Sequence, residues 1–125
     1  MPLTTILVED SKTIRDNLIP AMGELADIVV VAVAETAAEA LAAMEEYSSY
    51  WDLAVVDLFL KEGSGLTVLR ACQSRSPHQR VVVLTNYPTP QMRRRCLDLG
   101  ADAVFDKSGE LEAFFDYCNA TPRAG

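Results

Sequence analysis

Five short apolar runs alternate along the chain with longer stretches in which apolar residues recur every three or four positions. Near-continuous apolar strands are buried on both faces, which is typical of a parallel sheet covered by helices on each side. Five strand–helix units with right-handed crossovers therefore predict an α/β fold with an open, doubly wound parallel sheet. The predicted strands are Thr4–Val8, Ile28–Ala34, Leu53–Val56, Arg80–Leu84 and Ala103–Phe105.

Polar residues mark the start of each predicted helix. A side-chain oxygen before the first turn accepts a hydrogen bond from an unpaired backbone N–H, and proline fits the first helical position. Pro20, late in the first helical stretch, removes a backbone donor and is expected to kink or shorten that helix. The predicted caps are Ser11, Thr36 with Glu39 in a capping box, Ser64 with Gly65, Thr89 before Pro90, and Ser108 followed by Glu110 and Glu112.

The composition is that of one ordinary globular domain. A length of 125 residues fits a single domain over residues 1–125, and 50% hydrophobic with 23% charged residues is typical of a folded protein. A net charge of -7 argues against direct nucleic-acid binding through a broad basic face. No apolar run reaches the ~20 residues of a membrane span, and three widely spaced cysteines indicate neither zinc nor disulfides. We expect a cytoplasmic protein with buried thiols and no membrane contact.

Chemically active side chains fall where the predicted strands end. Glu9 and Asp10 follow the first strand, Asp57 the third and Thr85 the fourth, and Lys107 comes just after the fifth. Ligands of an open parallel sheet bind beyond the carboxyl ends of its strands, so these residues share one edge. Alone, each would be read as a helix cap, a turn residue or a surface charge. Their arrival at one edge indicates a site.

Three converging carboxylates need a cation, since otherwise they repel and raise one another's pKa. Mg²⁺, with Mn²⁺ as the alternative, prefers carboxylate, water and phosphate oxygens. No histidine or cysteine stands in these segments, which argues against zinc and copper. A carboxylate beside such an ion can attack phosphorus to give an acyl phosphate, with Lys107 neutralising the group and the Thr85 hydroxyl hydrogen-bonding it.

The chain contains, in order, the segments ILVEDS (6–11), VVDLFL (55–60), GSGL (63–66), VVVLTN (81–86), and GAD (100–102) through FDKS (105–108). With this spacing the sequence resembles the receiver domains of two-component response regulators, such as the chemotaxis regulators. The resemblance covers about residues 4–119 and leaves 120–125 as a tail. It implies the flavodoxin-like strand order 2-1-3-4-5, with five helices in three α/β/α layers. It also implies a signalling protein rather than an enzyme, apart from self-catalysed phosphorylation and slow dephosphorylation. Because no output segment follows the fifth predicted helix, we expect a stand-alone receiver.

The resemblance assigns roles to the acidic residues. Asp57 would be the phosphoacceptor. Asp10 would bind Mg²⁺ directly and Glu9 through water, and Asp57 with the backbone carbonyl of Phe59 would complete the protein's ligands. The donor would be a phosphohistidine on a sensor histidine kinase or on a histidine phosphotransfer protein.

The resemblance also assigns the switch. Thr85 would be the switch hydroxyl, and Lys107 would pair with the phosphoryl group. The position three before the lysine is usually Tyr or Phe in this family and here is Val104. Coupling of Thr85 to a swinging ring is therefore not expected in its usual form, and Phe105 or Tyr87 are the candidates to replace it.

Bulky residues are expected around the acceptor. Phe59, Asn86 and Tyr87 occupy positions that flank the phosphoryl site in the family, and Ser108 replaces the usual proline after the lysine. We interpret the first three as crowding out the attacking water, which predicts a long-lived aspartyl phosphate.

Output is expected through binding to a downstream protein. The family uses the face of the fourth helix, fifth strand and fifth helix, which also offers a route to a homodimer. Arg93, Arg94 and Arg95 give the fourth helix a local basic run in an acidic protein. The run is read either as a solvated helix face or as a docking or dimer patch whose exposure depends on phosphorylation.

Other readings stay open or fit less well. A shuttle receiver within a phosphorelay would have the same sequence pattern. A pseudo-receiver that serves only as a binding module is disfavoured by the intact acids, threonine and lysine. A flavin-binding domain would need a phosphate-cradling loop where Glu9 and Asp10 stand, and an aspartate-based phosphatase would need an acid where Phe59 stands.

Overall fold

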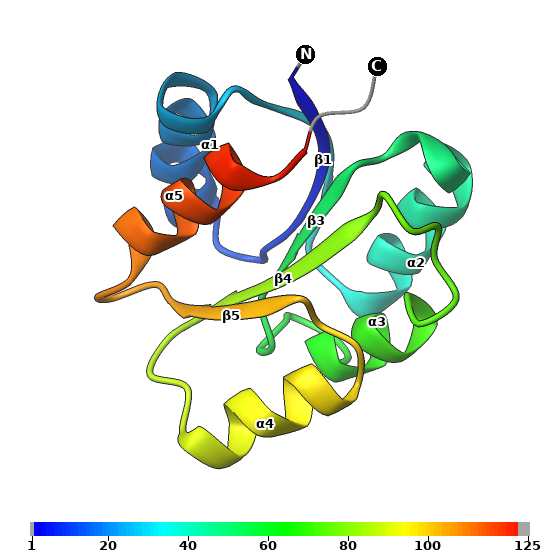
Figure 1. Ribbon diagram of the computed structural model, residues 1–125. Coiled ribbons are helices and arrows are strands. Elements are labelled where there is room, and N and C mark those ends of the chain that lie inside the picture. The colour runs from blue at the N-terminus through cyan, green and yellow to red at the C-terminus, as the bar shows by residue number, and fades with distance from the viewer. Residues whose placement is uncertain (1, 123–125) are drawn as a thin grey trace.

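The chain forms one five-stranded parallel sheet with helices on both faces (Figure 1). A computed structural model describes residues 2–122. The strand order is β2-β1-β3-β4-β5, so the predicted α/β class and the 2-1-3-4-5 order are confirmed. The strands are β1 Leu3–Val8, β2 Ile28–Ala34, β3 Leu53–Val56, β4 Arg80–Thr85 and β5 Ala103–Asp106. The helices are α1 Lys12–Ala26, α2 Ala37–Tyr47, α3 Gly65–Ala71, α4 Pro90–Asp98 and α5 Leu111–Ala120, with a short 3₁₀ turn at Ser48–Tyr50.

Two apolar clusters hold the layers together. Helices α1 and α5 cover one face of the sheet, where Met22 and Phe114 are fully buried against the central strands (Figure 1). Helices α2, α3 and α4 cover the other face, where Val83 and Cys96 are fully buried. The three cysteines are buried, as predicted, and burial raises the pKa of Cys72 to about 11.

Four of the five predicted helix caps are confirmed. Ser11, Thr36, Ser64 and Thr89 each accept a backbone N–H from the first turn of the following helix. The fifth is wrong, because α5 begins only at Leu111 and Ser108 caps nothing. The N–H of Ser108 instead donates to Asp106 Oδ1 at 2.8 Å, which holds residues 106–110 in a turn.

Pro20 does not shorten its helix. Helix α1 continues through it to Ala26, with Pro20 exposed and Met22 buried against the core. A proline removes one backbone donor. Burial of the apolar face on both sides of that position outweighs the loss of one bond on the solvent side.

The end of α5 is anchored. Thr121, in the predicted tail, is buried, and its hydroxyl donates to the Tyr117 carbonyl at 2.9 Å. Residues 123–125 of that tail lie outside the described residues. Over the part of the chain that is described, no helix is both long and apolar enough to cross a membrane.

Candidate functional site

Strand register brings the acidic residues together. Val8 of β1 pairs with Val56 of β3, so Glu9 and Asp57 leave adjacent strands at the same level. The backbone fixes this level beyond the strands, because the N–H of Asp57 donates to the Val8 carbonyl at 3.0 Å. The central position of β1 and β3 in the sheet therefore places both acids at the middle of its carboxyl edge.

Glu9, Asp10 and Asp57 form a cluster of oxygen ligands. One carboxylate oxygen from each lies within 4.8 Å of the other two. Glu9 is only 3% exposed and Asp57 7%, whereas Asp10 is half-buried. A compact, oxygen-only donor set on a partly open pocket suits a hard divalent cation that keeps some of its water. The residues present fit a divalent metal.

Lys107 bridges two of these acids. Its ammonium Nζ lies 2.6 Å from Glu9 Oε1 and 2.9 Å from Asp57 Oδ2, with its side chain only 9% exposed. Burial lowers the pKa of Lys107, but the hydrogen bonds and charges of the two acids outweigh it, so the pKa is raised and the ammonium stays charged. The pKa of Glu9 is raised, because the effect of burial is larger than the opposing effect of the hydrogen bonds from Lys107 and the Ser11 N–H.

The second oxygen of Asp57 has two donors of its own. The hydroxyl of Thr85, itself 1% exposed, donates to Asp57 Oδ1 at 3.0 Å, and the N–H of Phe59 donates to the same atom at 3.3 Å. Asp57 is thus fixed by a hydroxyl, an amide and an ammonium. The position of the Phe59 carbonyl as a metal ligand stays a prediction.

Two residues that support the site were not singled out by sequence reasoning for that role. Arg15 of α1 is half-buried and donates to the Glu9 carbonyl at 2.9 Å and to Glu35 Oε2 at 3.0 Å, which fixes the acidic loop. Gly65 lies so close to the acceptor strand end that a Cβ there would overlap the Asp57 carbonyl oxygen and approach Leu58 Cα to 2.8 Å. The spacing of Gly63 and Gly65 in the sequence hints at a tight turn that needs glycine. Nothing in the sequence around Arg15 indicates that it supports the site.

The chain matches the family described as response regulator receiver domain over residues 5–119. The chain belongs to this receiver family. It is 33% identical over 118 residues to the two-component response regulator PhoP of Pseudomonas aeruginosa, covering 94% of this chain and 51% of that protein. It is 32% identical over 101 residues to the DNA-binding transcriptional activator DevR/DosR of Mycobacterium tuberculosis, covering 81% of this chain and 46% of that one. The chain therefore spans about half the length of these relatives.

A solved structure agrees with the fold at low identity. A response regulator protein from Burkholderia pseudomallei has a TM-score of 0.77 at 22% identity, covering 94% of this chain and 67% of that one, and contains a phosphorylated aspartic acid, a calcium ion and citrate. Receiver domains are signalling modules of two-component systems that bind a divalent metal at an acidic pocket and interact with histidine kinases and downstream effectors. In this receiver Glu9, Asp10 and Asp57 form an acidic cluster that could hold such an ion.

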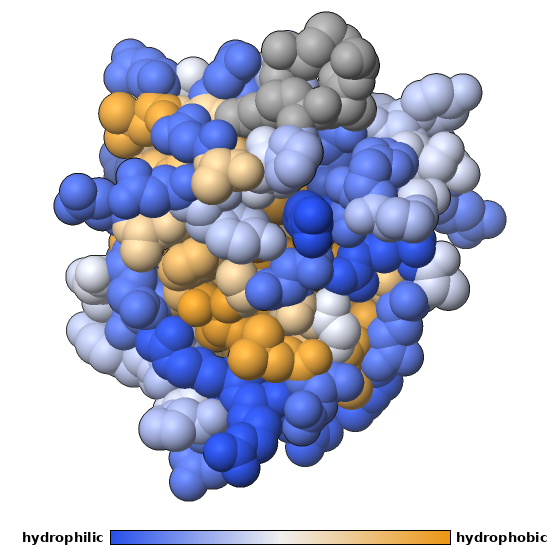
Figure 2. Space-filling model, viewed as in Figure 1, coloured by the Kyte–Doolittle hydropathy of each residue, from blue (hydrophilic) through white to orange (hydrophobic). Residues whose placement is uncertain are grey.

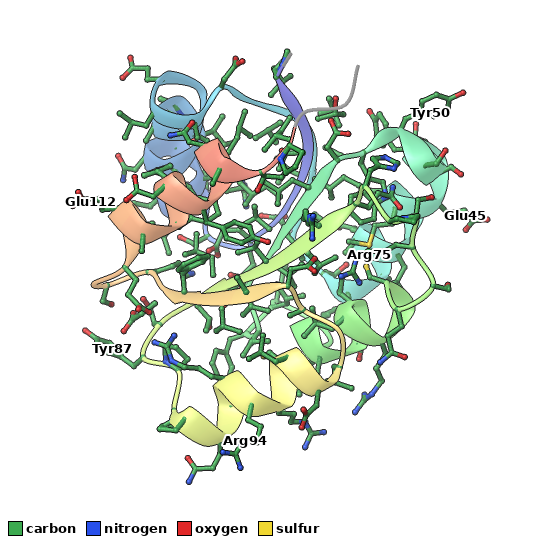
Figure 3. All side chains as sticks on the ribbon, in the orientation of Figure 1. Glu45, Tyr50, Arg75, Tyr87, Arg94 and Glu112 are labelled. Carbon is green, nitrogen blue, oxygen red and sulfur yellow. The ribbon has the colours of Figure 1, made fainter. Side chains whose placement is uncertain are left out.

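The three arginines of α4 in this receiver are not equivalent. Arg94 and Arg95 are exposed, and Figure 3 shows Arg94 directed away from the molecule. Arg93 is half-buried, with NH1 3.2 Å from the Val104 carbonyl and NH2 2.7 Å from Glu110 Oε1. Figure 2 shows apolar surface over β5 and hydrophilic surface over the outer side of α4. Only Arg94 and Arg95 are free to serve the predicted docking patch.

Aromatic side chains of the site region differ in placement. Phe59 and Tyr87 are 69% and 77% exposed, and Figure 3 shows Tyr87 directed outward from the loop after β4. Val104 packs on the α4 side of the sheet, whereas Phe105 contacts Phe114 on the opposite side, with ring centroids 5.9 Å apart. Of the two rings expected to replace a switch aromatic, Phe105 therefore lies on the wrong face of β5 to contact α4.

Proposed function

We propose that this receiver accepts a phosphoryl group on the Asp57 carboxylate, with a divalent ion bound by Glu9, Asp10 and Asp57. One observation carries the proposal. A nearly buried carboxylate is held between a charged ammonium and a buried hydroxyl, beside two further acids. A purely structural aspartate has no need of two neighbouring carboxylates, which raise the free energy of the folded state by repulsion.

Charge balance supports a divalent ion. Three carboxylates and one ammonium sum to a formal charge of -2. A doubly positive ion cancels this charge, and oxygen-only ligands favour Mg²⁺, with Mn²⁺ as the alternative. When bound, the ion would neutralise oxygens of the incoming phosphoryl group and hold it in line with the acceptor.

The transfer needs little acid–base chemistry. An Asp57 oxygen attacks phosphorus and forms a new O–P bond, while the N–P bond of the donor phosphohistidine breaks and its electron pair returns to the imidazole nitrogen. Lys107 would hydrogen-bond one phosphoryl oxygen. The Thr85 hydroxyl would leave Asp57 Oδ1 and donate to another.

The donor and the output follow the family pattern. A histidine kinase or a histidine phosphotransfer protein would supply the phosphoryl group, and the α4–β5–α5 face would bind a downstream protein or a second copy. Cys72 and Cys96 are buried free thiols, which fits a reducing compartment such as the cytoplasm. A phosphorelay shuttle shares the acceptor chemistry and differs in returning the group to a histidine.

Mass spectrometry of the intact protein tests the proposal. The parent, Asp57→Ala and Asp98→Ala would be incubated with Mg²⁺ and either acetyl phosphate or phosphoramidate. Asp98 is an exposed aspartate at the end of α4 and serves as the matched control. The parent and Asp98→Ala should each gain one phosphoryl group, and Asp57→Ala none. A parent that gains nothing from either donor, or an Asp57→Ala variant that still gains the group, contradicts the proposal.

A further inference from the structure

Arg93 ties α4 to the two elements beside it. Its guanidinium donates to the Val104 carbonyl on β5 and to Glu110, the residue before α5, at 3.2 and 2.7 Å. It is the arginine of its run that is withdrawn from solvent, with 34% of its side chain exposed. One side chain thus joins α4, β5 and the start of α5.

The same contacts continue toward the acceptor. Glu110 Oε1 also accepts the N–H of Asp106 at 2.9 Å. Asp106 Oδ1 in turn accepts the N–H of Tyr87 at 3.2 Å, and the Ser108 hydroxyl donates to Asn86 Oδ1 at 3.1 Å. The loop that follows Thr85 is therefore fastened to the turn after β5, and that turn is fastened to α4 through Arg93. The hydrogen bond from Arg93 lowers the pKa of Glu110, which keeps that link ionised at neutral pH.

Donor counting shows which part of this network must change on phosphorylation. An ammonium has three N–H donors, and Lys107 uses two of them, on Glu9 and Asp57. Its third can meet a phosphoryl oxygen without leaving either acid. A hydroxyl has one donor, and Thr85 already uses it on Asp57 Oδ1. The Thr85 hydroxyl must therefore turn from Asp57 toward the phosphoryl group, whereas Lys107 need not move. The backbone of Thr85 is tied to the turn after β5, because the N–H of Lys107 donates to the Thr85 carbonyl at 2.8 Å.

A shift of Thr85 would act first on the contacts between its loop and that turn. Besides the Lys107–Thr85 backbone hydrogen bond, these are the Tyr87–Asp106 and Asn86–Ser108 hydrogen bonds, and Arg93 holds the far end of the same turn to α4. Valine at position 104 leaves no ring on this side of β5 to carry the motion.

We propose that Arg93 is a positioning residue that stabilises the unphosphorylated arrangement, and that movement of Thr85 onto the phosphoryl group loosens the Arg93–Glu110 contact and releases α4. The inference rests on the proposed function, since it requires a phosphoryl group on Asp57. Arg93 touches neither the donor nor the acceptor and acts only through Glu110 and Asp106.

Linkage makes the inference measurable. If phosphorylation weakens a contact, removal of that contact must favour the phosphorylated arrangement by the same factor. A partly exposed ion pair with one added hydrogen bond corresponds to about fivefold in affinity. Arg93→Ala should therefore bind beryllofluoride, a phosphoryl mimic, about fivefold more tightly than the parent in the presence of Mg²⁺.

Calorimetric titration of beryllofluoride with Mg²⁺ into the full chain provides the test. Arg70→Ala removes the same charge from an exposed position on α3, outside the predicted docking patch, and should match the parent. Glu110→Gln removes the other partner of the ion pair and should also bind beryllofluoride more tightly than the parent. This variant tests the inference even if Arg93→Ala folds poorly. The exchange Arg93→Glu with Glu110→Arg restores the pair and should return the affinity toward the parent value. In the parent, the Arg93 side-chain Nε–H resonance should shift on beryllofluoride addition, a change that a merely structural arginine would not show.

The outcomes separate the two proposals. If the parent binds beryllofluoride but Arg93→Ala and Glu110→Gln bind with the parent's affinity or more weakly, the role of Arg93 is refuted and the phosphoacceptor function stands. If the parent itself binds no beryllofluoride and gains no phosphoryl group, the proposed function fails and the inference with it.

Discussion

Lys107→Met removes the cation from the acidic pocket while keeping a side chain of similar length. In the parent, Nζ makes two charge-assisted hydrogen bonds, at 2.6 Å to Glu9 and 2.9 Å to Asp57, from a side chain that is 9% exposed. Removing one partner from a buried ion pair leaves an uncompensated charge and typically costs 3–5 kcal/mol. Because Glu9 can take up a proton in response, we expect the lower end, about 3 kcal/mol of lost unfolding free energy at pH 7.

Urea unfolding with chelator present measures this loss. Lys12→Met is the matched control, because Lys12 only pairs with Asp16 one turn along α1 and both side chains are mostly exposed. That variant should lie within about 0.5 kcal/mol of the parent. If Lys107→Met unfolds at the same free energy as Lys12→Met, the ammonium does not balance the pocket and the electrostatic argument fails.

The loss of unfolding free energy in Lys107→Met, here called the deficit, should also depend on pH. The pKa of Glu9 is raised in the folded parent, by burial against the lysine's opposing effect. The folded state thus holds that proton more tightly than the unfolded chain, so the contribution of Glu9 is greatest below the unfolded pKa and is lost as the pH rises through the folded pKa. Loss of the lysine raises the folded pKa further. The deficit should shrink between pH 7 and pH 5, and a constant deficit would show that Glu9 is not the responding group.

Three further outcomes are expected. Mg²⁺ at 100 times its Kd should stabilise the parent by about 2.7 kcal/mol in thermal or urea unfolding, and Asp10→Asn should lose most of that gain at the same concentration. The acyl phosphate should decay faster in the double variant Phe59→Asn with Tyr87→Glu than in the parent; equal decay measured by mass spectrometry would refute crowding of the attacking water. Gly65→Ala should lose roughly 2 kcal/mol or more, since its Cβ meets backbone, whereas Gly109→Ala, with nothing within 4 Å, should unfold like the parent.

The fold was predictable because its signals are local. Runs such as Ile28–Ala34 have the apolar continuity that only a strand buried on both faces needs, and the structure gives that strand the same bounds. The failures were also local rules that tertiary contacts overrode. Ser108 has a good capping side chain, but Asp106 takes its N–H and its hydroxyl goes to Asn86 across the loop. Pro20 breaks helices in isolation, but here the buried face of α1 carries the helix through.

The site was predictable to the extent that strand ends determine it. Asp57, Thr85 and Lys107 meet because parallel strands share their carboxyl edge, whatever the side chains between them do. Arg93 and Arg15 were not predictable, because their partners are carbonyls and carboxylates outside their own helices, 6 to 20 residues away, which no local pattern pairs with them. Nothing in a run of three arginines distinguishes the one that folds back onto β5 from the two that face water.

The charge of the pocket sets an order of events. A phosphorylated histidine donor is itself anionic, and the unbound pocket has a formal charge of -2 within a chain of net charge -7. The positive charge of Lys107 is already counted in this sum, so two negative charges remain uncompensated. At an effective dielectric of 20, two like unit charges 4 Å apart repel by about 4 kcal/mol. Under the proposed function, the pocket must therefore be neutralised before a donor phosphoryl group can approach Asp57. Lys107 therefore contributes more to stabilising the phosphorylated product than to attracting the phosphoryl donor. Its loss should slow phosphorylation less than chelation of the metal does.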